Sequence, residues 1–296
     1  MPLMLIRYGE IGLKSNSVRR RFERSLVENI ENAFVAASMQ CRVTGERGRI
    51  YVAVDDAAAA VGVLRKVFGI VSFSQVAETG SEMSGMKKFV ADYASAVVRD
   101  GETFAVKATR QGSHPYTSLD MGRELGQVIL DANSSRGVRV NLDSPDRKIF
   151  VEVRNARAFV FSTAVKGPGG LPMGSQGKVL AILEKPEDAV GAWLMMRRGC
   201  KAALLSEDDA LAEPLAKWDP HLRVYKSLGD TPETMAGKLK CQAVTAGGTS
   251  YHPIGLTKGS EMPMLHPLVG LSSEEIARAL DDVRNGIPPH FGASNT

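Results

Sequence analysis

Apolar residues recur at a regular interval near the start of the chain. Between residues 18 and 37 they fall at every fourth position, at Val18, Phe22, Leu26, Ile30 and Phe34. This spacing gathers apolar side chains on one face and predicts an amphipathic helix. Strand and helix patterns surround it in the order β-α-β-β-α-β, which is typical of a ferredoxin-like domain. The predicted elements are a strand at 3–7, the helix at 18–37, strands at 41–44 and 50–54, a helix at 57–67 and a strand at 70–75.

A second block of mixed patterns follows a turn at residues 79–81. Its size and the alternation of helices with strands predict a compact α/β module. The predicted elements are helices at 86–98 and 118–133 and strands at 103–109, 138–141, 148–153 and 158–164.

Glycine is concentrated in the segment 166–177, which reads Lys-Gly-Pro-Gly-Gly-Leu-Pro-Met-Gly-Ser-Gln-Gly. Glycine and proline at this density predict a linker. Beyond it strands and helices alternate, which predicts a parallel sheet covered by helices. The strands are predicted at 179–183, 201–205, 222–225 and 243–246, and the helices at 187–198, 208–217, 231–240 and 272–285.

The composition excludes several classes of protein. Hydrophobic residues make up 44% and charged residues 24% of the chain, which is ordinary globular usage and unlike a fibrous or disordered protein. Apolar runs such as residues 57–64 are much shorter than the ~18 residues of a membrane span, and the first residues lack the apolar core of a signal peptide. The three cysteines and five histidines show no zinc-site spacing. We therefore expect a cytoplasmic protein that binds neither a membrane nor a metal.

Positive charge is concentrated near the N-terminus. Residues 1–75 carry 11 basic and 7 acidic side chains, whereas residues 167–296 carry 13 and 15. Cations at the start of a helix oppose its macrodipole, so a structural role explains the arginines of the first predicted helix poorly. The cluster favours binding of a polyanion. Its members are Arg19, Arg20, Arg21 and Arg24.

Several short motifs occur in a defined order along nearly the whole chain. They are Arg7-Tyr8-Gly9-Glu10-Ile11-Gly12-Leu13-Lys14-Ser15, Val67-Phe68-Gly69-Ile70, Gly169-Gly170-Leu171-Pro172-Met173-Gly174, Leu194-Met195-Met196-Arg197-Arg198-Gly199 and Leu265-His266-Pro267-Leu268-Val269-Gly270-Leu271. In order and spacing they resemble the tRNA 4-thiouridine synthetases, also called tRNA sulfurtransferases and linked to thiamine biosynthesis. Each string alone is weak, but the set together is specific.

The resemblance implies an α/β protein with three domains. A ferredoxin-like domain (1–75) is followed by a THUMP domain that binds RNA (76–166), a glycine-rich linker (167–177) and a Rossmann-like, parallel-sheet domain of the PP-loop ATP pyrophosphatase type (178–296). In that family the first two domains hold the acceptor end of tRNA. The third activates a uridine with ATP, so that sulfur from a persulfide replaces the uridine oxygen in tRNA modification.

The loop that binds pyrophosphate in that family is altered here. A PP-loop reads Ser-Gly-Gly-x-Asp-Ser, because small residues let backbone N–H groups and hydroxyls surround the pyrophosphate. Acidic side chains repel phosphate, and proline lacks an N–H donor. We interpret the altered loop as an ordinary helix start and therefore as a degenerate PP-loop, and the alternative is an unrecognised nucleotide site. The residues at this place are Glu184, Lys185, Pro186, Glu187 and Asp188.

Two other parts of the family's machinery also differ. The sequence Thr245-Ala246-Gly247-Gly248-Thr249-Ser250-Tyr251-His252 stands where the family has Thr-Gly-Glu-Ser-Leu-Gly-Gln. Because the sequence ends at Thr296, we expect no rhodanese-like extension, and the spacing of the cysteines predicts no pair suited to a persulfide relay. We expect Cys200 and Cys241 to be buried as small hydrophobic residues, with reactive thiols as the alternative.

The segments that face RNA in the family are better preserved. Basic side chains gain affinity from phosphates without reading sequence, and an aromatic ring stacks on an unpaired base. The alternative is an ordinary solvated surface, or for Lys166 a hinge between domains. The predicted RNA-binding residues are Lys14, Arg19, Arg20, Arg21, Arg24, Arg47, Arg49, Arg110, His114, Tyr116, Arg123 and Lys166.

These observations predict a tRNA-binding protein that has lost ATP-dependent thiolation and has neither catalytic residues nor a cofactor. Its expected partners are the acceptor region of tRNA and a separate sulfur-transfer or tRNA-modifying enzyme, and a homodimer is a further candidate. The first alternative is an active tRNA sulfurtransferase, alone or with a partner, with ATP and Mg as cofactors. The second is a protein-interaction module whose RNA binding has also decayed.

Overall fold

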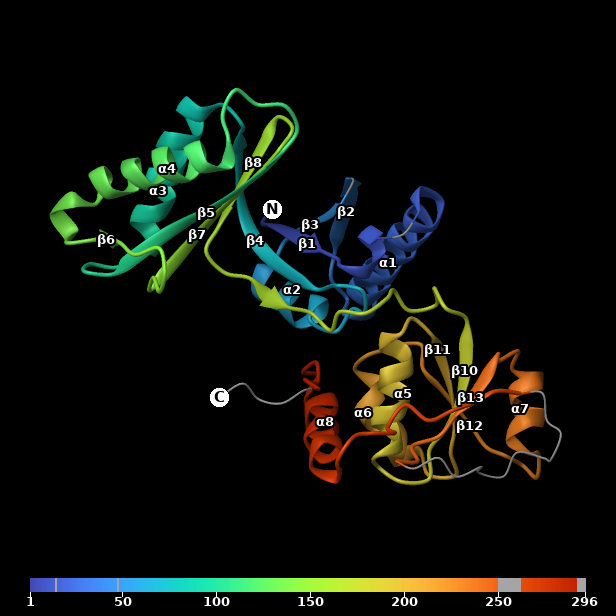
Figure 1. Cartoon of the computed structure of the whole chain (residues 1–296). Coiled ribbons are helices and arrows are strands. Elements are labelled where there is room, and N and C mark those ends of the chain that lie inside the picture. The colour runs from blue at the N-terminus through green and yellow to red at the C-terminus, as the bar shows by residue number, and fades with distance from the viewer. Residues whose placement is uncertain (14, 47, 250–261, 292–296) are drawn as a thin grey trace. The chain divides into compact units, whose positions relative to one another are not determined.

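The structure is a computed structural model that describes residues 1–13, 15–46, 48–249 and 262–291 (Figure 1). The chain is mixed α/β and divides into two compact units. One unit contains Met1–Leu5 and Ser74–Ala164, and the other contains Ile6–Phe73 and Val165–Thr296. No helix among the described residues is long and apolar enough to cross a membrane.

The first third of the chain has the predicted β-α-β-β-α-β order. Helix α1 buries Phe22, Leu26, Ile30 and Phe34, the apolar stripe that the spacing predicts. Asp56 caps the second helix by accepting hydrogen bonds from two backbone N–H groups in its first turn. The strands lie in the order β2-β3-β1-β4. The elements are β1 (Leu3–Arg7), α1 (Asn16–Ala36), β2 (Cys41–Glu46), β3 (Arg49–Val54), α2 (Ala57–Leu64) and β4 (Ser72–Gly80).

The middle part of the chain is a sheet with two helices on one face (Figure 1). Its strands lie in the order β4-β8-β7-β5-β6, with β5 parallel to β7 and β7 antiparallel to β8. Apolar residues of both helices, including Met86, Val90, Leu125 and Ile129, form its core. The elements are α3 (Met83–Val97), β5 (Thr103–Gln111), α4 (Ser118–Ala132), β6 (Arg139–Val140), β7 (Arg147–Arg154) and β8 (Arg157–Phe161).

The last third contains the predicted parallel sheet, in the order β12-β11-β10-β13-β14. Helices cover both faces: α5, α6 and α8 pack around Trp193, while α7 packs around Val244 (Figure 1). The predicted helix at 208–217 is divided into a 3-10 helix at Asp209–Ala212 and the short α6, whose first turn contains Pro214. The elements are β9 (Val165–Lys166), β10 (Lys178–Ile182), α5 (Asp188–Arg197), β11 (Lys201–Leu205), α6 (Glu213–Ala216), β12 (Arg223–Tyr225), α7 (Pro232–Lys238), β13 (Ala243–Thr245), β14 (Met264–Leu265) and α8 (Ser273–Asn285).

The glycine-rich segment predicted as a linker is held by backbone hydrogen bonds. Gly169 exchanges two of them with the segment before β4: its N–H donates to Ile70 and its carbonyl accepts from Gly69, each at 2.8 Å. A Cβ on Gly170 would lie 2.0 Å from the carbonyl oxygen of Arg197, so only glycine fits there. The segment therefore packs on both of its neighbours, and its role as a domain boundary stays a prediction.

Aromatic packing joins the ferredoxin-like fold to the C-terminal sheet within their shared unit. The ring of Phe68 lies 5.5 Å from those of Trp193 and Trp218, measured between centroids. The side-chain amide of Asn29 in α1 donates a hydrogen bond to the carbonyl of Met173 at 3.0 Å. These contacts fix the two walls of the cavity that lies between them.

Candidate nucleic-acid interface and altered nucleotide loop

The loop between β10 and α5 is closed by its own carboxylate. Asp188 is buried, and its Oδ2 accepts hydrogen bonds from the backbone N–H groups of Glu184 at 2.8 Å and Lys185 at 3.0 Å. Ligands of parallel α/β sheets bind at the carboxyl ends of the strands, which is where this loop lies. A carboxylate of the chain itself thus occupies two backbone donors, the kind of group that binds phosphate at a helix start.

The turn after β13 packs directly on this loop. Gly247 lies so close to Asp188 that a Cβ on the glycine would be 1.9 Å from Oδ1 of the carboxylate. Thr245 is buried, and its hydroxyl donates to the carbonyl of Leu265. Thr249 is exposed, while Ser250, Tyr251 and His252 lie outside the described residues. The two segments that the resemblance assigns to a nucleotide pocket therefore contact each other here.

Three of the predicted RNA-binding arginines line one hollow on the ferredoxin-like fold. Arg19 and Arg20 from α1 and Arg49 from β3 surround a volume of about 370 Å³, together with Asn16 and Glu46. Arg20 is exposed, whereas Arg19 is half-buried and donates to Asn16 Oδ1 at 2.8 Å. The hollow combines three cations and an amide with the carboxylates of Glu23 and Glu46, and its cations and amide suit contacts to phosphate and sugar.

Other predicted cations of this unit lie outside that hollow or outside the described residues. Arg21 and Arg24 are exposed on α1, and the guanidinium of Arg21 lies 5.3 Å from the ring centroid of Phe22. Lys166 is exposed on β9, opposite Ser72 of β4. Lys14 and Arg47 lie outside the described residues.

Tyr8 and Glu23 support the hollow, and the residue patterns alone did not single them out. The Tyr8 hydroxyl donates to Glu23 and accepts from the backbone N–H of Gly48, the latter at 2.9 Å. Glu23 also lies 3.7 Å from Nε of Arg19. Burial, followed by the hydrogen bond to Glu23, raises the pKa of Tyr8, so its hydroxyl stays neutral. In the sequence, Tyr8 is marked by its position in the motif that begins at Arg7.

The other group of candidates lies between β5 and α4, in the unit that contains residues 74–164. His114 is half-buried and stacks on Tyr116, with ring centroids 5.3 Å apart and an interplanar angle of 16°. Tyr116 is itself buried in the core, and its hydroxyl donates to the carbonyl of Ser81 at 2.5 Å. Of the two rings predicted to stack on a base, that of His114 is therefore the accessible one. The buried ring of Tyr116 packs against it.

Two exposed arginines accompany this ring pair. The guanidinium of Arg110 lies at the turn that contains Gly112. Its Nη1 donates a hydrogen bond to the carbonyl of Gly112 at 3.1 Å. Arg123 is exposed on α4, the helix that follows the loop. The chain thus carries candidate RNA-binding residues in both of its compact units.

The cysteines lie in positions that disfavour thiol chemistry. Cys200 and Cys241 are buried, as predicted, and Cys41 is half-buried. Burial raises the pKa of the thiol in each case, which lowers the fraction of reactive thiolate. Among the described residues, no group of three or more His, Cys, Asp or Glu side chains could hold a metal ion.

Comparison with known proteins agrees with this architecture. Residues 3–74 match the family model of the ThiI ferredoxin-like domain, and residues 81–163 match that of the THUMP domain. A probable tRNA sulfurtransferase of Methanobrevibacter smithii is 32% identical over 335 aligned positions, which cover 95% of this chain and 86% of that protein. The chain belongs to the tRNA sulfurtransferase family.

Other members of the tRNA sulfurtransferase family match over a shorter part. The probable tRNA sulfurtransferase of Methanosarcina acetivorans is 39% identical over 67% of this chain and 48% of its own length. That of Methanothermobacter thermautotrophicus is 36% identical over 79% of this chain and 59% of its own length. Against these relatives the matched part of the chain spans only about half to three fifths of their length.

Solved structures have the same fold. A Pyrococcus horikoshii protein of 27% sequence identity superposes with a TM-score of 0.80 over 97% of this chain and 100% of its own. A 4-thiouridine synthetase, solved as a complex with RNA and bound ATP, superposes with a TM-score of 0.77 at 23% identity, over 96% of this chain and 85% of its own. The family and the α/β fold class predicted from the motifs are therefore confirmed.

Proposed function

We propose that the chain binds the acceptor region of tRNA and that its C-terminal domain no longer performs ATP-dependent thiolation. The observation that carries the second part is the position of Asp188, whose carboxylate binds the backbone N–H groups of Glu184 and Lys185. A phosphate placed there would meet a buried negative charge instead of free donors. The buried thiols of Cys200 and Cys241 supply no obvious sulfur carrier.

Support for tRNA as the partner comes from two sides. Relatives of the chain are named tRNA sulfurtransferases, and a protein of the same fold was solved with RNA. The chain itself places exposed or half-buried cations of α1 beside Arg49, and His114 with Arg110 at the β5–α4 loop. Cations of this kind contribute affinity through phosphates, and His114 adds a surface for stacking. On this proposal, thiolation of the bound tRNA requires a separate enzyme.

Calorimetric titration separates the two parts of the proposal. Unmodified tRNA transcript should bind with an affinity that falls as salt rises, whereas ATP with magnesium should show no binding that depends on the loop 183–188, so Lys185→Ala should leave any ATP binding unchanged. Micromolar ATP binding that Lys185→Ala weakens would contradict the loss of the nucleotide site and favour the active sulfurtransferase. Absence of tRNA binding would contradict the first part and favour a protein-interaction module.

Paired variants test which surface meets the tRNA. Arg20→Ala with Arg24→Ala removes two exposed cations of α1, and Arg65→Ala with Arg278→Ala removes two exposed cations elsewhere in the same unit. We expect the first pair to weaken tRNA binding and to reduce the slope of log affinity against log salt by about one per lost phosphate contact. Equal effects of the two pairs would mean that only total charge matters.

A further inference from the structure

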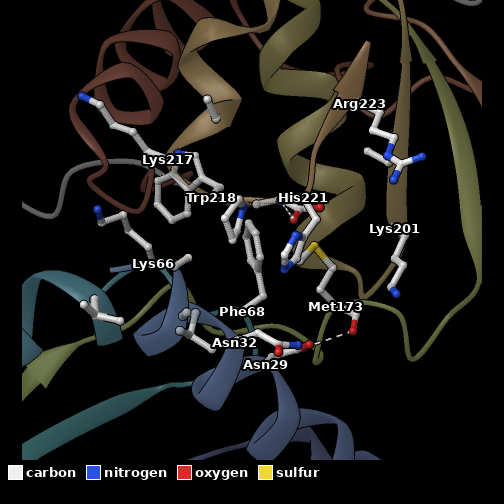
Figure 2. A pocket seen from close by; sticks show the side chains of 18 of the residues that line it. Asn29, Asn32, Lys66, Phe68, Met173, Lys201, Lys217, Trp218, His221 and Arg223 are labelled. Atoms are coloured by element: carbon white, nitrogen blue, oxygen red, sulfur yellow. Dashed lines mark hydrogen bonds between the residues drawn. The ribbon is translucent and has the colours of Figure 1, made fainter. Parts of the chain in front are cut away.

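A second cavity, of about 500 Å³, lies within the unit that contains residues 6–73 and 165–296 (Figure 2). Its volume is in the range of small-molecule sites. One wall is the C-terminal half of α1, and the other includes the first residues of β10, β11 and β12, which are Lys178, Lys201 and Arg223. The cavity is thus at the amino ends of the strands, whereas the loop 183–188 follows the carboxyl end of β10.

The lining of this cavity carries an excess of positive charge. Among the described residues, the one carboxylate of the lining is that of Asp219, whose Oδ1 already accepts a hydrogen bond from the backbone N–H of His221 at 2.8 Å. That carboxylate therefore stabilises its own turn. The basic side chains of the lining are Lys66, Lys178, Lys201, Lys217 and Arg223.

Three of these cations have a structural role at helix ends. Nζ of Lys217 donates to the carbonyl of Arg284 in α8 at 2.6 Å, and Nζ of Lys178 donates to the carbonyl of Leu239, which ends α7, at 3.1 Å. The stem of Lys66 lies beside Gly286, directly after α8. Cations at the C-terminal end of a helix complement its dipole, so these three need no ligand to explain them.

Lys201 and Arg223 do not lie at helix ends, although the stem of Lys201 lies beside Gly174. Both are exposed, and within the part of the chain that the structure describes neither side chain forms a hydrogen bond or an ion pair. Lys201 lies directly opposite Lys178 in the β10–β11 register, while Arg223 lies opposite Ala203 on the next strand. Like charges that face each other on neighbouring strands are destabilising, and a bound anion would offset this cost. A lysine and an arginine on neighbouring strands, with Arg223 opposite the residue two positions after Lys201, suit a phosphate.

The remaining wall mixes apolar and polar groups. Figure 2 shows Phe68, Trp218, Met173 and His221 around the middle of the cavity, with Lys201 and Arg223 together at one side of it. Phe68 and Trp218 are themselves buried, so Met173 and His221 supply more of the accessible surface. Ala33 and Ala36 of α1 add small apolar groups, and Asn32 adds an exposed amide. A ligand that is anionic at one end and planar, with apolar and polar groups, at the other matches this division.

We propose that this cavity binds a nucleoside phosphate, with its phosphate on Lys201 and Arg223 and its base against the remaining wall. Two sources share this chemistry: a free mononucleotide and a nucleotide within an RNA strand. The site is separate from the loop 183–188. The proposal that it binds a nucleotide therefore does not depend on the proposed loss of thiolation.

The first test measures binding of AMP, inorganic phosphate and a short single-stranded RNA to the full chain by calorimetry at low salt. The wild type should bind AMP or the RNA, and Lys201→Ala with Arg223→Ala should weaken that binding at least about tenfold, since each charged hydrogen bond is worth roughly that factor. Lys88→Ala with Arg99→Ala, two exposed cations of the other unit, should leave it unchanged. AMP binding identifies the free nucleotide as the source. RNA binding that the Lys201 and Arg223 variant weakens and the control variant does not, without AMP binding, identifies the strand.

A second variant tests the cavity without altering charge. Ala36→Trp places a large ring in the lining at an exposed position of α1, where the fold tolerates it, and should also abolish binding. AMP binding that survives both variants would overturn the proposal, as would RNA binding that neither variant weakens where AMP does not bind, or the absence of saturable binding by the wild type. Inorganic phosphate bound as tightly as AMP would overturn the assignment of the remaining wall to the base.

Discussion

Gly247 and Asp188 pack against each other so closely that the glycine has no room for a side chain. A Cβ there would lie 1.9 Å from Oδ1 of the carboxylate and 2.9 Å from its Cα. Gly247→Ala should therefore destabilise the C-terminal domain by about 1–3 kcal/mol, the usual cost of overpacking. Both tryptophans of the chain, Trp193 and Trp218, lie in this domain, so the unfolding of this region can be followed by tryptophan fluorescence in urea.

The control for Gly247→Ala is Gly237→Ala. Gly237 lies in α7, and a Cβ there would meet nothing within 4 Å, so alanine should leave stability unchanged or raise it by up to about 1 kcal/mol. In an Asp188→Ala background the cost of Gly247→Ala should shrink, because the clashing carboxylate is gone. Equal costs of Gly247→Ala in both backgrounds would contradict the packing described here.

His114 and Tyr116 should respond differently to substitution. Tyr116→Phe removes the hydrogen bond to Ser81 and should lower the stability of its unit by about 1 kcal/mol, with little effect on tRNA affinity. His114→Ala should cost little stability but should weaken tRNA binding by about 1–3 kcal/mol if the ring stacks on a base. Circular dichroism during thermal unfolding and calorimetric titration with tRNA measure the two effects. A loss of tRNA affinity in Tyr116→Phe but not in His114→Ala would contradict the assignment of His114 as the ring that stacks on a base.

The sequence predicted those features that depend on local periodicity. The buried stripe of α1 follows from apolar residues four positions apart, and the parallel sheet from alternating strands and helices. Strand β14, with only Met264 and Leu265, was missed because two residues carry no periodic signal. Local rules of this kind act within one element, so they need no knowledge of the rest of the fold.

The sites depend on contacts that such rules do not contain. The acidic residues of the loop 183–188 were visible, but the return of the Asp188 carboxylate to two backbone N–H groups depends on the loop conformation. The sequence pattern puts Tyr116 in a loop, yet its side chain belongs to the hydrophobic core. Lys201 and Arg223 become neighbours only because β12 lies next to β11. Strand order and loop shape are properties of the whole domain, which explains why these features were not predicted.

Acid should destabilise the unit that contains α4. Hydrogen bonds from the backbone and side chain of Thr117 lower the pKa of Asp120, and those from Thr103 lower the pKa of Asp146. A carboxylate whose pKa is lower in the folded state stabilises it above its unfolded pKa, near 3.9, and loses this contribution as pH falls through the folded pKa. The melting temperature should thus fall below about pH 4, and less steeply in Asp120→Asn with Asp146→Asn. Parallel pH profiles of the wild type and this variant would contradict the assignment.

The three thiols should react in an order set by their burial. Cys41 is half-buried, whereas Cys200 and Cys241 are buried, and burial raises the pKa of all three. Alkylation by iodoacetamide requires the thiolate and access to it, so at pH 8 Cys41 should be modified first and the other two only after unfolding. Mass spectrometry of the peptides from a time course gives the three rates. Fast modification of Cys200 or Cys241 in the folded chain would reveal an activated thiol and would favour a role of that cysteine in sulfur transfer.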